Sequence, residues 1–341
     1  MRIAVVASPV TPLRPAQLGG AQAFICDLAA GLVARGHDVT LHCTEGSEVA
    51  GVKVATVRAP LDATAALVMP GGAPPPPAPG VAAALGAMFE AIAAERVDVI
   101  SQHAFDAPAF ELARGLPVLH TLHLPPIVDA VVAAARDVPP SQLATVSRSC
   151  LESWQGVGIE VGRVLPNGVG DAPVEFSPVR AALIAGRISP EKGIEHAIEA
   201  AQAAGLQVRI AGAHYDPAYE VDLSGTVQFG SLRRDELHQL MGQSAVTICA
   251  VRWEEPFGMV AAEAQMAGCP VAAYRRGAMP EVVEEGVSGF LAEPDDVGEL
   301  TLAVRKCLAL DRMRVRSSAH RRLGLDAALD RYEKALQQVA G

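Results

Sequence analysis

The chain has 341 residues, half of them hydrophobic, which is enough for about two domains with separate cores. Its formal net charge of −10 argues against nucleic acid as a partner, because binding a phosphate backbone needs a basic face. The six cysteines form no Cys-x-x-Cys pair, so we expect free thiols rather than a zinc or redox site. No apolar run reaches the ~18 to 20 residues of a transmembrane helix, and the N-terminus resembles a strand more than a signal peptide. These features predict a cytoplasmic protein without a transmembrane segment.

The first half alternates predicted strands and helices. Residues 2–7 form an apolar strand, residues 21–34 have a helical pattern that Gly36 ends, and residues 38–43 form the next strand. Apolar, β-branched runs recur at residues 97–101, 117–121 and 143–146. Near-continuous apolar strands separated by helices indicate a parallel sheet covered on both faces.

Residues 70–80 carry six prolines and three glycines, which predicts a long polyproline-like loop without regular structure. Such a loop is either a spacer or a segment that shapes the acceptor side of a cleft. Further on, Pro166-Asn167-Gly168 ends the first domain, and an irregular linker runs to Arg180.

A second strand–helix series follows the linker. Strands are predicted at residues 181–185, 208–212, 226–229, 246–250 and 271–274, and residues 312–339 are mostly helical. The expected organisation is therefore α/β, with domains at residues 1–170 and 171–311 and a helical segment, 312–341, that returns to the first domain.

Two cations stand five residues apart after the first strand of this series. Gly186-Arg187 and Lys192-Gly193 frame a turn, and a helix is predicted to begin near Gly193. A diphosphate bound here would meet a guanidinium fork, an ammonium and backbone N–H groups. The alternative is a surface loop with two solvated cations.

Two acids, Glu255 and Glu263, stand eight residues apart around a Pro-Phe-Gly turn. Gly258 permits close backbone approach, and Pro256 suits the start of a helix whose positive end would face an anion. Glu263 would lie inside that helix among apolar residues, where a carboxylate needs partners. Ribose hydroxyls or an arginine of the second domain would serve.

These motifs, with Gly277-Ala278-Met279-Pro280-Glu281 and Gly289-Phe290, resemble the donor half of glycosyltransferase family 4. The resemblance implies retaining enzymes of the GT-B fold, in which two Rossmann-like domains with parallel sheets face each other across a deep cleft. It implies that Arg187 and Lys192 bind the donor diphosphate, that Glu255 contacts the donor sugar, and that Glu263 contacts the ribose. The catalytic residues would be Glu255, Arg187 and Lys192 together with His103. The full donor-binding set would be Gly19, Gly20, Gly186, Arg187, Lys192, Gly230, Ser231, Leu232, Glu255, Phe257, Gly258, Met259, Val260 and Glu263.

The resemblance extends to the first domain through Gly19-Gly20 and through two strand ends. His103 matches a histidine that lies near the reacting sugar, while Ser101 replaces the histidine that usually precedes it. His123 follows the next strand, and Ser101 and His123 are candidates for the acceptor side. His120 and His123 stand three apart on a strand and therefore point to opposite faces, which disfavours a metal site.

The chain departs from the family pattern at several positions. Gly170 stands where an aspartate is usual, Ala278 replaces a glycine, and the Pro-Ser that often precedes the first acid is absent, with Ala-Val-Arg-Trp-Glu at residues 250–254. No Asp-x-Asp motif is present to hold a metal against a diphosphate. We therefore expect a donor site without metal or cofactor.

The resulting hypothesis is a retaining glycosyltransferase that moves a sugar from a nucleoside-diphosphate donor, with UDP the expected nucleotide, to a hydroxyl of a small-molecule or oligosaccharide acceptor. The Arg-, Ala- and Pro-rich composition is typical of an actinomycete tailoring enzyme, which suggests antibiotic or other natural-product biosynthesis. A sugar-nucleotide epimerase of the same fold and a non-catalytic nucleotide-binding module are alternatives. A dehydrogenase is disfavoured because the first strand leads to Ala7-Ser8-Pro9-Val10 rather than to a Gly-x-Gly-x-x-Gly turn.

Overall fold

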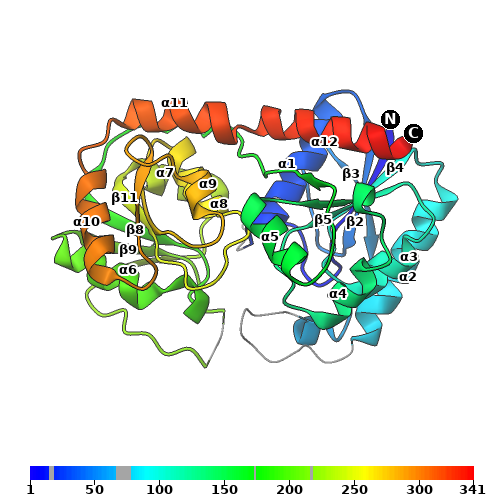
Figure 1. Cartoon of the computed structure of the whole chain (residues 1–341), viewed down its shortest axis with the longest axis horizontal. Coiled ribbons are helices and arrows are strands. Elements are labelled where there is room, and N and C mark those ends of the chain that lie inside the picture. Colours follow the sequence, from blue (N-terminus) through cyan, green and yellow to red (C-terminus); the bar gives the residue numbers. More distant parts are fainter. Residues whose placement is uncertain (15–18, 67–77, 173, 216–217) are drawn as a thin grey trace. The chain divides into compact units, whose positions relative to one another are not determined.

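The computed structural model describes residues 1–14, 19–66, 78–172, 174–215 and 218–341 (Figure 1). The chain divides into two compact units. The first unit contains the described parts of Met1–Pro15, Ala21–Pro166 and Ala328–Gly341, and the second contains those of Ala16–Gly20 and Asn167–Ala327.

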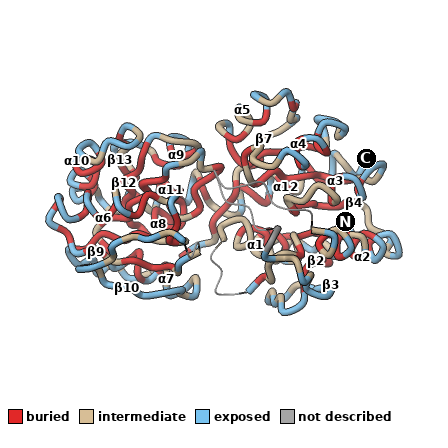
Figure 2. The backbone as a smooth tube through the Cα atoms, turned by 90° about the horizontal axis from the view of Figure 1, so that it is seen from below, coloured by how far each residue is buried: buried red, intermediate tan, exposed pale blue. Residues whose placement is uncertain are grey.

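In the first unit, seven strands form a parallel sheet in the order β3-β2-β1-β4-β5-β6-β7. The inner strands are short, apolar and buried, as a sheet covered on both faces requires (Figure 2). The strands are β1 (Arg2–Val6), β2 (Asp38–Thr44), β3 (Lys53–Val57), β4 (Val99–Gln102), β5 (Val118–Leu122), β6 (Leu143–Thr145) and β7 (Arg163–Val164).

Helices cover both faces of this sheet. Apolar side chains of α2 and α3 form one core with Ala4, Val6 and Ile100 of the strands. On the opposite face, Phe24 of α1 packs on Tyr332 of α12 (Figure 1). The helices are α1 (Gly20–Ala34), α2 (Pro79–Ala94), α3 (Ala107–Leu112), α4 (Asp129–Ala135), α5 (Arg148–Gly156) and α12 (Leu325–Ala340), with 3₁₀ helices at Ala63–Ala66 and Pro140–Gln142.

The predicted polyproline loop at residues 70–80 lies mostly outside the described residues. The prediction is wrong for the last two residues of this range, because α2 begins at Pro79 and includes Gly80. Proline is well suited to the first turn of a helix, where its missing N–H would have no partner within the helix.

In the second unit, six strands form a parallel sheet in the order β10-β9-β8-β11-β12-β13. The strands are β8 (Val179–Ala185), β9 (Gln207–Ala211), β10 (Val227–Gly230), β11 (Ser244–Cys249), β12 (Val271–Tyr274) and β13 (Gly289–Ala292). In both sheets, the first strand of the unit lies inside the sheet. The next two strands are added on one side of it and the later strands on the other, so the strand order reverses beside the first strand. This is the doubly wound arrangement of Rossmann-like folds.

Helices α6 and α10 pack together on one face of the second sheet, and α8 and α11 pack together on the other (Figure 1). The helices are α6 (Ile194–Ala203), α7 (Arg234–Gly242), α8 (Met259–Met266), α9 (Met279–Val282), α10 (Val297–Cys307) and α11 (Arg312–Leu323), with a 3₁₀ helix at Pro190–Lys192. No helix of the described residues is long and apolar enough to cross a membrane.

The predicted α/β class with two parallel sheets is confirmed. Three strands were not predicted, namely β3, β7 and β13. All three are edge strands; β3 is largely exposed, and β7 has only two residues.

Candidate functional site

The predicted cations and the first acid meet at one point of the second sheet. Strands β8 and β11 are neighbours there, with β9 and β10 on one side and β12 and β13 on the other. In doubly wound sheets, ligands bind outside the carboxyl ends of the strands at this reversal of strand order. Arg187 and Lys192 follow β8, and Glu255 follows β11.

Lys192 and Glu255 form an ion pair at this edge. The Lys192 Nζ lies 2.8 Å from Oε2 of Glu255, and the side chains are 19% and 12% exposed. The indole N–H of Trp253 donates to the same oxygen at 2.8 Å. Burial raises the pKa of Glu255, but the charge of Lys192 and the two hydrogen bonds lower it more, so this pKa lies below its ordinary value.

Arg187 is held from two sides. Its Nη2 lies 3.3 Å from Oε1 of Glu191, whose side chain is 4% exposed. Its guanidinium also stands 4.6 Å from the ring centroid of Tyr215, which follows β9. Neither Glu191 nor Tyr215 was predicted as a site residue, although Glu191 directly precedes Lys192 in the sequence.

Two glycines shape the loops that carry these side chains. Gly193 adopts a left-handed conformation (φ 61°), and a Cβ there would stand 2.0 Å from the carbonyl oxygen of Ala250. Gly258 (φ 92°) caps α8, which begins at Met259 rather than near Pro256. Pro256 therefore lies before the helix rather than in its first turn. Gly258 separates the two, in a backbone conformation that glycine adopts more readily than other residues.

Glu263 is buried inside α8 and already has a cationic partner. Arg234 Nε donates to its Oε1 at 2.9 Å, and His238 Nε2 lies 3.8 Å from that oxygen, beyond an ordinary hydrogen bond. Burial raises the pKa of Glu263, but His238 and Arg234 lower it more. The ion pair with an arginine thus accounts for the burial of this carboxylate without a ligand.

Other predicted donor-site residues lie along the same sheet edge. Gly186 N–H donates to Ala211 at 2.9 Å, and Gly212 N–H donates to Gly230 at 2.8 Å, so the loops after β8, β9 and β10 are joined. Ser231 is exposed and Leu232 half-buried after β10, while Phe257 and Met259 are buried and Val260 half-buried. Gly19 and Gly20 group with the second unit, where a Cβ at Gly20 would stand 2.6 Å from Cγ of Met259.

The predicted residues of the first unit form a buried polar chain. Ser101 Oγ lies 2.8 Å from Nε2 of His103, and Nδ1 of His103 lies 2.9 Å from Nε2 of His123. Both ring nitrogens of His103 are therefore engaged, whichever tautomer is present. Nδ1 of His123 has no hydrogen-bond partner in the described part of the chain.

The two histidines are neutral at pH 7. Burial lowers the pKa of His123 to about 4, and burial together with His123 lowers that of His103 well below its ordinary value. His120 stacks on Phe110 with ring centroids 4.6 Å apart. Within the described ranges, no three His, Cys, Asp or Glu side chains gather in a way that could hold a metal ion.

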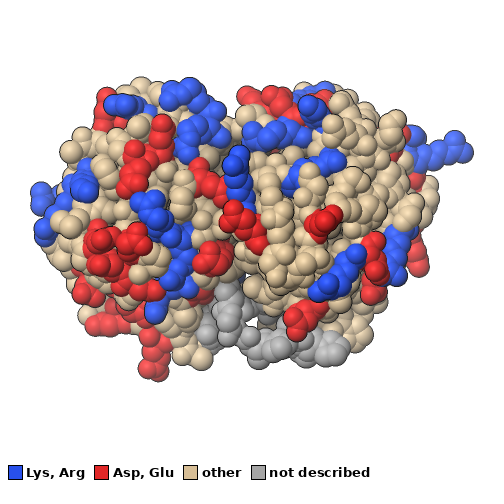
Figure 3. All heavy atoms as spheres, in the orientation of Figure 1, with Lys and Arg blue, Asp and Glu red and all other residues tan. Residues whose placement is uncertain are grey.

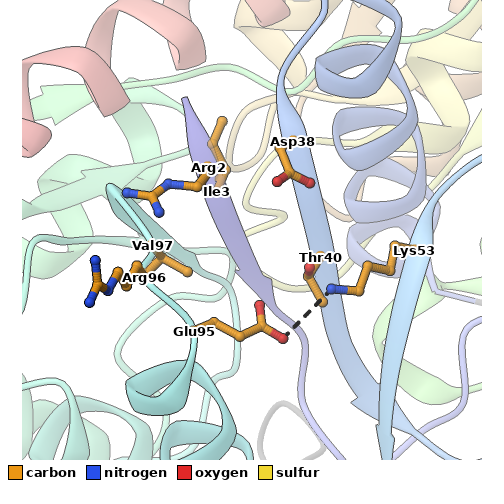
Figure 4. Close-up of a pocket in the computed structure, with 8 residues that line it drawn as sticks. All are labelled: Arg2, Ile3, Asp38, Thr40, Lys53, Glu95, Arg96 and Val97. Atoms are coloured by element: carbon orange, nitrogen blue, oxygen red, sulfur yellow. Dashed lines mark ion pairs between the residues drawn. The ribbon is translucent and has the colours of Figure 1, made fainter.

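A separate hollow of about 260 Å³ lies at the amino ends of β1 to β3 (Figure 4). Lys53 and Glu95 pair across it at 3.8 Å, and Arg2 pairs with Asp98 beside it at 2.9 Å. These charges compensate one another, and the carboxyl ends of the strands, where doubly wound sheets bind ligands, lie at the opposite edge of the sheet. We therefore place no catalytic site in this hollow.

Charged side chains are interspersed on the face of the molecule shown in Figure 3, where acidic and basic residues alternate.

Comparisons with known proteins identify the class. Residues 18–171 match the family model "Glycosyltransferase Family 4", and residues 174–322 match "Glycosyl transferases group 1". The chain belongs to the glycosyltransferases of family 4 type, with the GT-B fold.

Among curated proteins, an uncharacterized 41.2 kDa protein in the cps region of Klebsiella pneumoniae is 30% identical over 35% of this chain and 34% of its own length. D-inositol 3-phosphate glycosyltransferase of Mycolicibacterium smegmatis is 27% identical over 65% of this chain and 62% of its own length. The matched stretches thus span about a third to three fifths of these relatives.

Two solved structures match almost throughout. AviGT4, a glycosyltransferase involved in avilamycin A biosynthesis, has a TM-score of 0.76 and 21% identity over 99% of this chain and 98% of its own. HepE of Anabaena in complex with UDP-glucose has a TM-score of 0.76 and 19% identity over 99% of this chain and all of its own. At these identities, the likeness establishes the fold.

Proposed function

We propose that this glycosyltransferase is a retaining, metal-independent enzyme that moves a sugar from a UDP-sugar to an acceptor hydroxyl. The observation that carries the proposal is the ion pair between Lys192 and Glu255, 2.8 Å long, beside Arg187 at the carboxyl edge of the second sheet. A cation pair suits a diphosphate, and an acid that stays ionised suits sugar hydroxyls.

In this proposal, Arg187 and Lys192 bind the diphosphate and stabilise the charge that develops on it as the anomeric bond lengthens. Such preorganised electrostatic stabilisation is commonly the largest contribution to catalysis. Arg187 is preorganised, because Glu191 and Tyr215 already hold its guanidinium. The N–H groups of Met259 and Val260, at the positive end of α8, add donors for the phosphates.

The acceptor hydroxyl then attacks the anomeric carbon on the face that the diphosphate leaves. A phosphate oxygen of the leaving group takes the proton, so no side chain is needed as the base. Glu255 holds a hydroxyl of the donor sugar, and Glu263 a hydroxyl of the ribose. We assign acceptor-side binding to the first unit, with His123 and Ser101 as candidates, and we place His103 beside the donor sugar.

The assignment of UDP is supported by HepE of Anabaena, whose structure contains UDP-glucose. A role in antibiotic or other natural-product biosynthesis is supported by the likeness to AviGT4 of the avilamycin A pathway.

The direct test is calorimetric titration with UDP, GDP and ADP, followed by incubation with UDP-glucose without an acceptor. We expect UDP to bind most tightly and UDP-glucose to release UDP and glucose slowly, with water as the acceptor. A product that is an isomerised UDP-sugar would instead identify an epimerase. Binding of UDP without any turnover across candidate donors and acceptors would identify a non-catalytic module.

A further inference from the structure

Trp253 stands where the chain departs most clearly from the expected motif, two residues before Glu255. It is partly exposed and makes two contacts with the proposed donor site. Its indole N–H donates to Oε2 of Glu255 at 2.8 Å, and its ring centroid lies 5.7 Å from Nζ of Lys192. It therefore contacts both members of the ion pair.

The backbone on either side of Trp253 is fixed by hydrogen bonds. The N–H of Arg252 donates to the carbonyl of Glu191 at 2.8 Å, and the N–H of Ala278 donates to the carbonyl of Glu255 at 2.8 Å. Both bonds join the loop to a neighbouring segment of the second unit. The loop thus fixes the position of the Trp253 backbone, and the hydrogen bond to Glu255 orients the indole N–H.

The two donors on Glu255 share one oxygen. Lys192 and Trp253 both reach Oε2, while Oε1 accepts no hydrogen bond from the described part of the chain. Lys192 lies on a flexible stem and can turn towards an arriving phosphate, whereas an indole N–H has one fixed direction. When the ammonium moves, the indole remains as the donor on a carboxylate that would otherwise lose its partners.

We propose that Trp253 is a positioning residue that holds the Glu255 carboxylate in place during donor binding and leaves Oε1 for a hydroxyl of the donor sugar. The proposal rests on the proposed function of Glu255. It predicts that losing the indole N–H impairs turnover of a sugar donor and leaves binding of the bare nucleotide unchanged.

The experiment compares Trp253→Phe with Trp154→Phe. Both variants lose one indole hydrogen bond, since Trp154 donates to the carbonyl of Leu124 at 2.9 Å. Trp154, however, is fully buried and belongs to the first unit, whereas Glu255 belongs to the second. Phenylalanine at position 253 keeps an aromatic ring near Lys192, so the difference between the variants isolates the N–H.

We expect Trp253→Phe to lower kcat for UDP release from UDP-glucose by about 10- to 100-fold, as loss of a hydrogen bond to a charged group implies. The acid limb of its pH–kcat profile should move to higher pH, because the Glu255 carboxylate loses a donor that favours its ionised form. Trp154→Phe should leave that limb in place, and calorimetry should give the wild-type affinity for UDP in both variants.

Two results would overturn the proposal while leaving the enzyme assignment intact: wild-type kcat and acid limb in Trp253→Phe, or a UDP affinity that falls in parallel with turnover. The second would make Trp253 a nucleotide contact. A wild-type protein that neither binds UDP nor releases it from UDP-glucose would overturn the proposed function and this inference together.

Discussion

The carboxyl edges of the two sheets carry different chemistry on the same framework. Each sheet has its first strand inside, the next two strands on one side and the following strands on the other. The edge of the second sheet bears Lys192 and Glu255 as a charged pair, both partly exposed. The edge of the first sheet bears His103 and His123, which are buried, neutral and hydrogen-bonded to each other.

The contrast indicates that the strand order sets where a ligand can bind, while the loops set which chemistry it meets. A guanidinium and an ammonium are donors whose charge suits an anion. Neutral imidazoles can bind hydroxyls and cannot neutralise a diphosphate. The predictions below test this division between a charge-binding and a hydroxyl-binding edge.

The largest effect is expected from Lys192→Ala. The variant removes the ammonium that we assign to the leaving diphosphate, so turnover of UDP-glucose should fall by about 100- to 1,000-fold. Lys306→Ala is the matched control, because Lys306 lies on α10 over the ring of Phe290, at 5.4 Å. The thermal midpoint of each variant should be measured to separate catalysis from folding. Unchanged kinetics in Lys192→Ala would contradict the charge-binding role of this edge.

The neutral histidines of the first sheet should make the stability of the first unit fall at acidic pH. The pKa of His123 is about 4 in the folded chain against an ordinary 6.5, so protonation favours the unfolded chain. Its contribution to stability is complete above about pH 6.5 and is lost as the pH falls towards 4, amounting to roughly 3 kcal/mol. Urea unfolding in a Trp253→Phe background, followed by the emission of buried Trp154, would measure this for the first unit.

The control for the acid effect is His123→Gln in the same background. Carboxylates titrate in both proteins, so only the difference between their pH dependences reports the histidine. We expect the glutamine variant to lose less stability between about pH 7 and pH 5. Parallel curves would mean that His123 is not held neutral by burial.

How far the sequence predicts this molecule depends on the range of the interaction. The apolar periodicity of residues 2–7 and 38–43 predicted strands that the structure places within a residue of their expected ends. Strand β3, which is mostly exposed and mixes Lys53 with apolar residues, has no such pattern and was not predicted. Local patterns thus identify the inner strands and miss three of the four edge strands; the exception is the exposed edge strand β10, which was predicted.

The same limit applies to the site. The glycine, cation and acid motifs could be read as short segments, and Lys192 and Glu255 do meet. The contacts of Tyr215 with Arg187 and of Arg234 with Glu263 join separate loops, and no spacing along the chain predicts them. Trp253 was visible only as a departure from a motif, because its role depends on the direction of one N–H group.

Glu263 sharpens the comparison, because its ion pair with Arg234 explains its burial without a ligand. If it also holds the ribose, Glu263→Gln should weaken UDP binding by about 10- to 100-fold, the value of a hydrogen bond to a charged group. The wild-type preference for UDP over 2′-deoxy-UDP should shrink in this variant, as calorimetry would show. Arg234→Gln is the comparison variant, since it breaks the ion pair and keeps the carboxylate. Equal loss of stability in both variants with UDP affinity intact would make Glu263 structural.

The smallest effect concerns metal. Arg187 and Lys192 supply two positive charges near the proposed diphosphate position, which is the neutralisation that a divalent cation provides in other phosphate sites. We therefore expect EDTA to leave the release of UDP from UDP-glucose unchanged, with Lys192→Ala assayed alongside. If Mg²⁺ restored part of the activity of Lys192→Ala alone, the ion would be replacing the missing ammonium, and the charge assignment would gain support. A wild-type enzyme that EDTA inactivates and Mg²⁺ restores would show that the two side chains are insufficient, and the edge of the second sheet would need a metal to bind its anion.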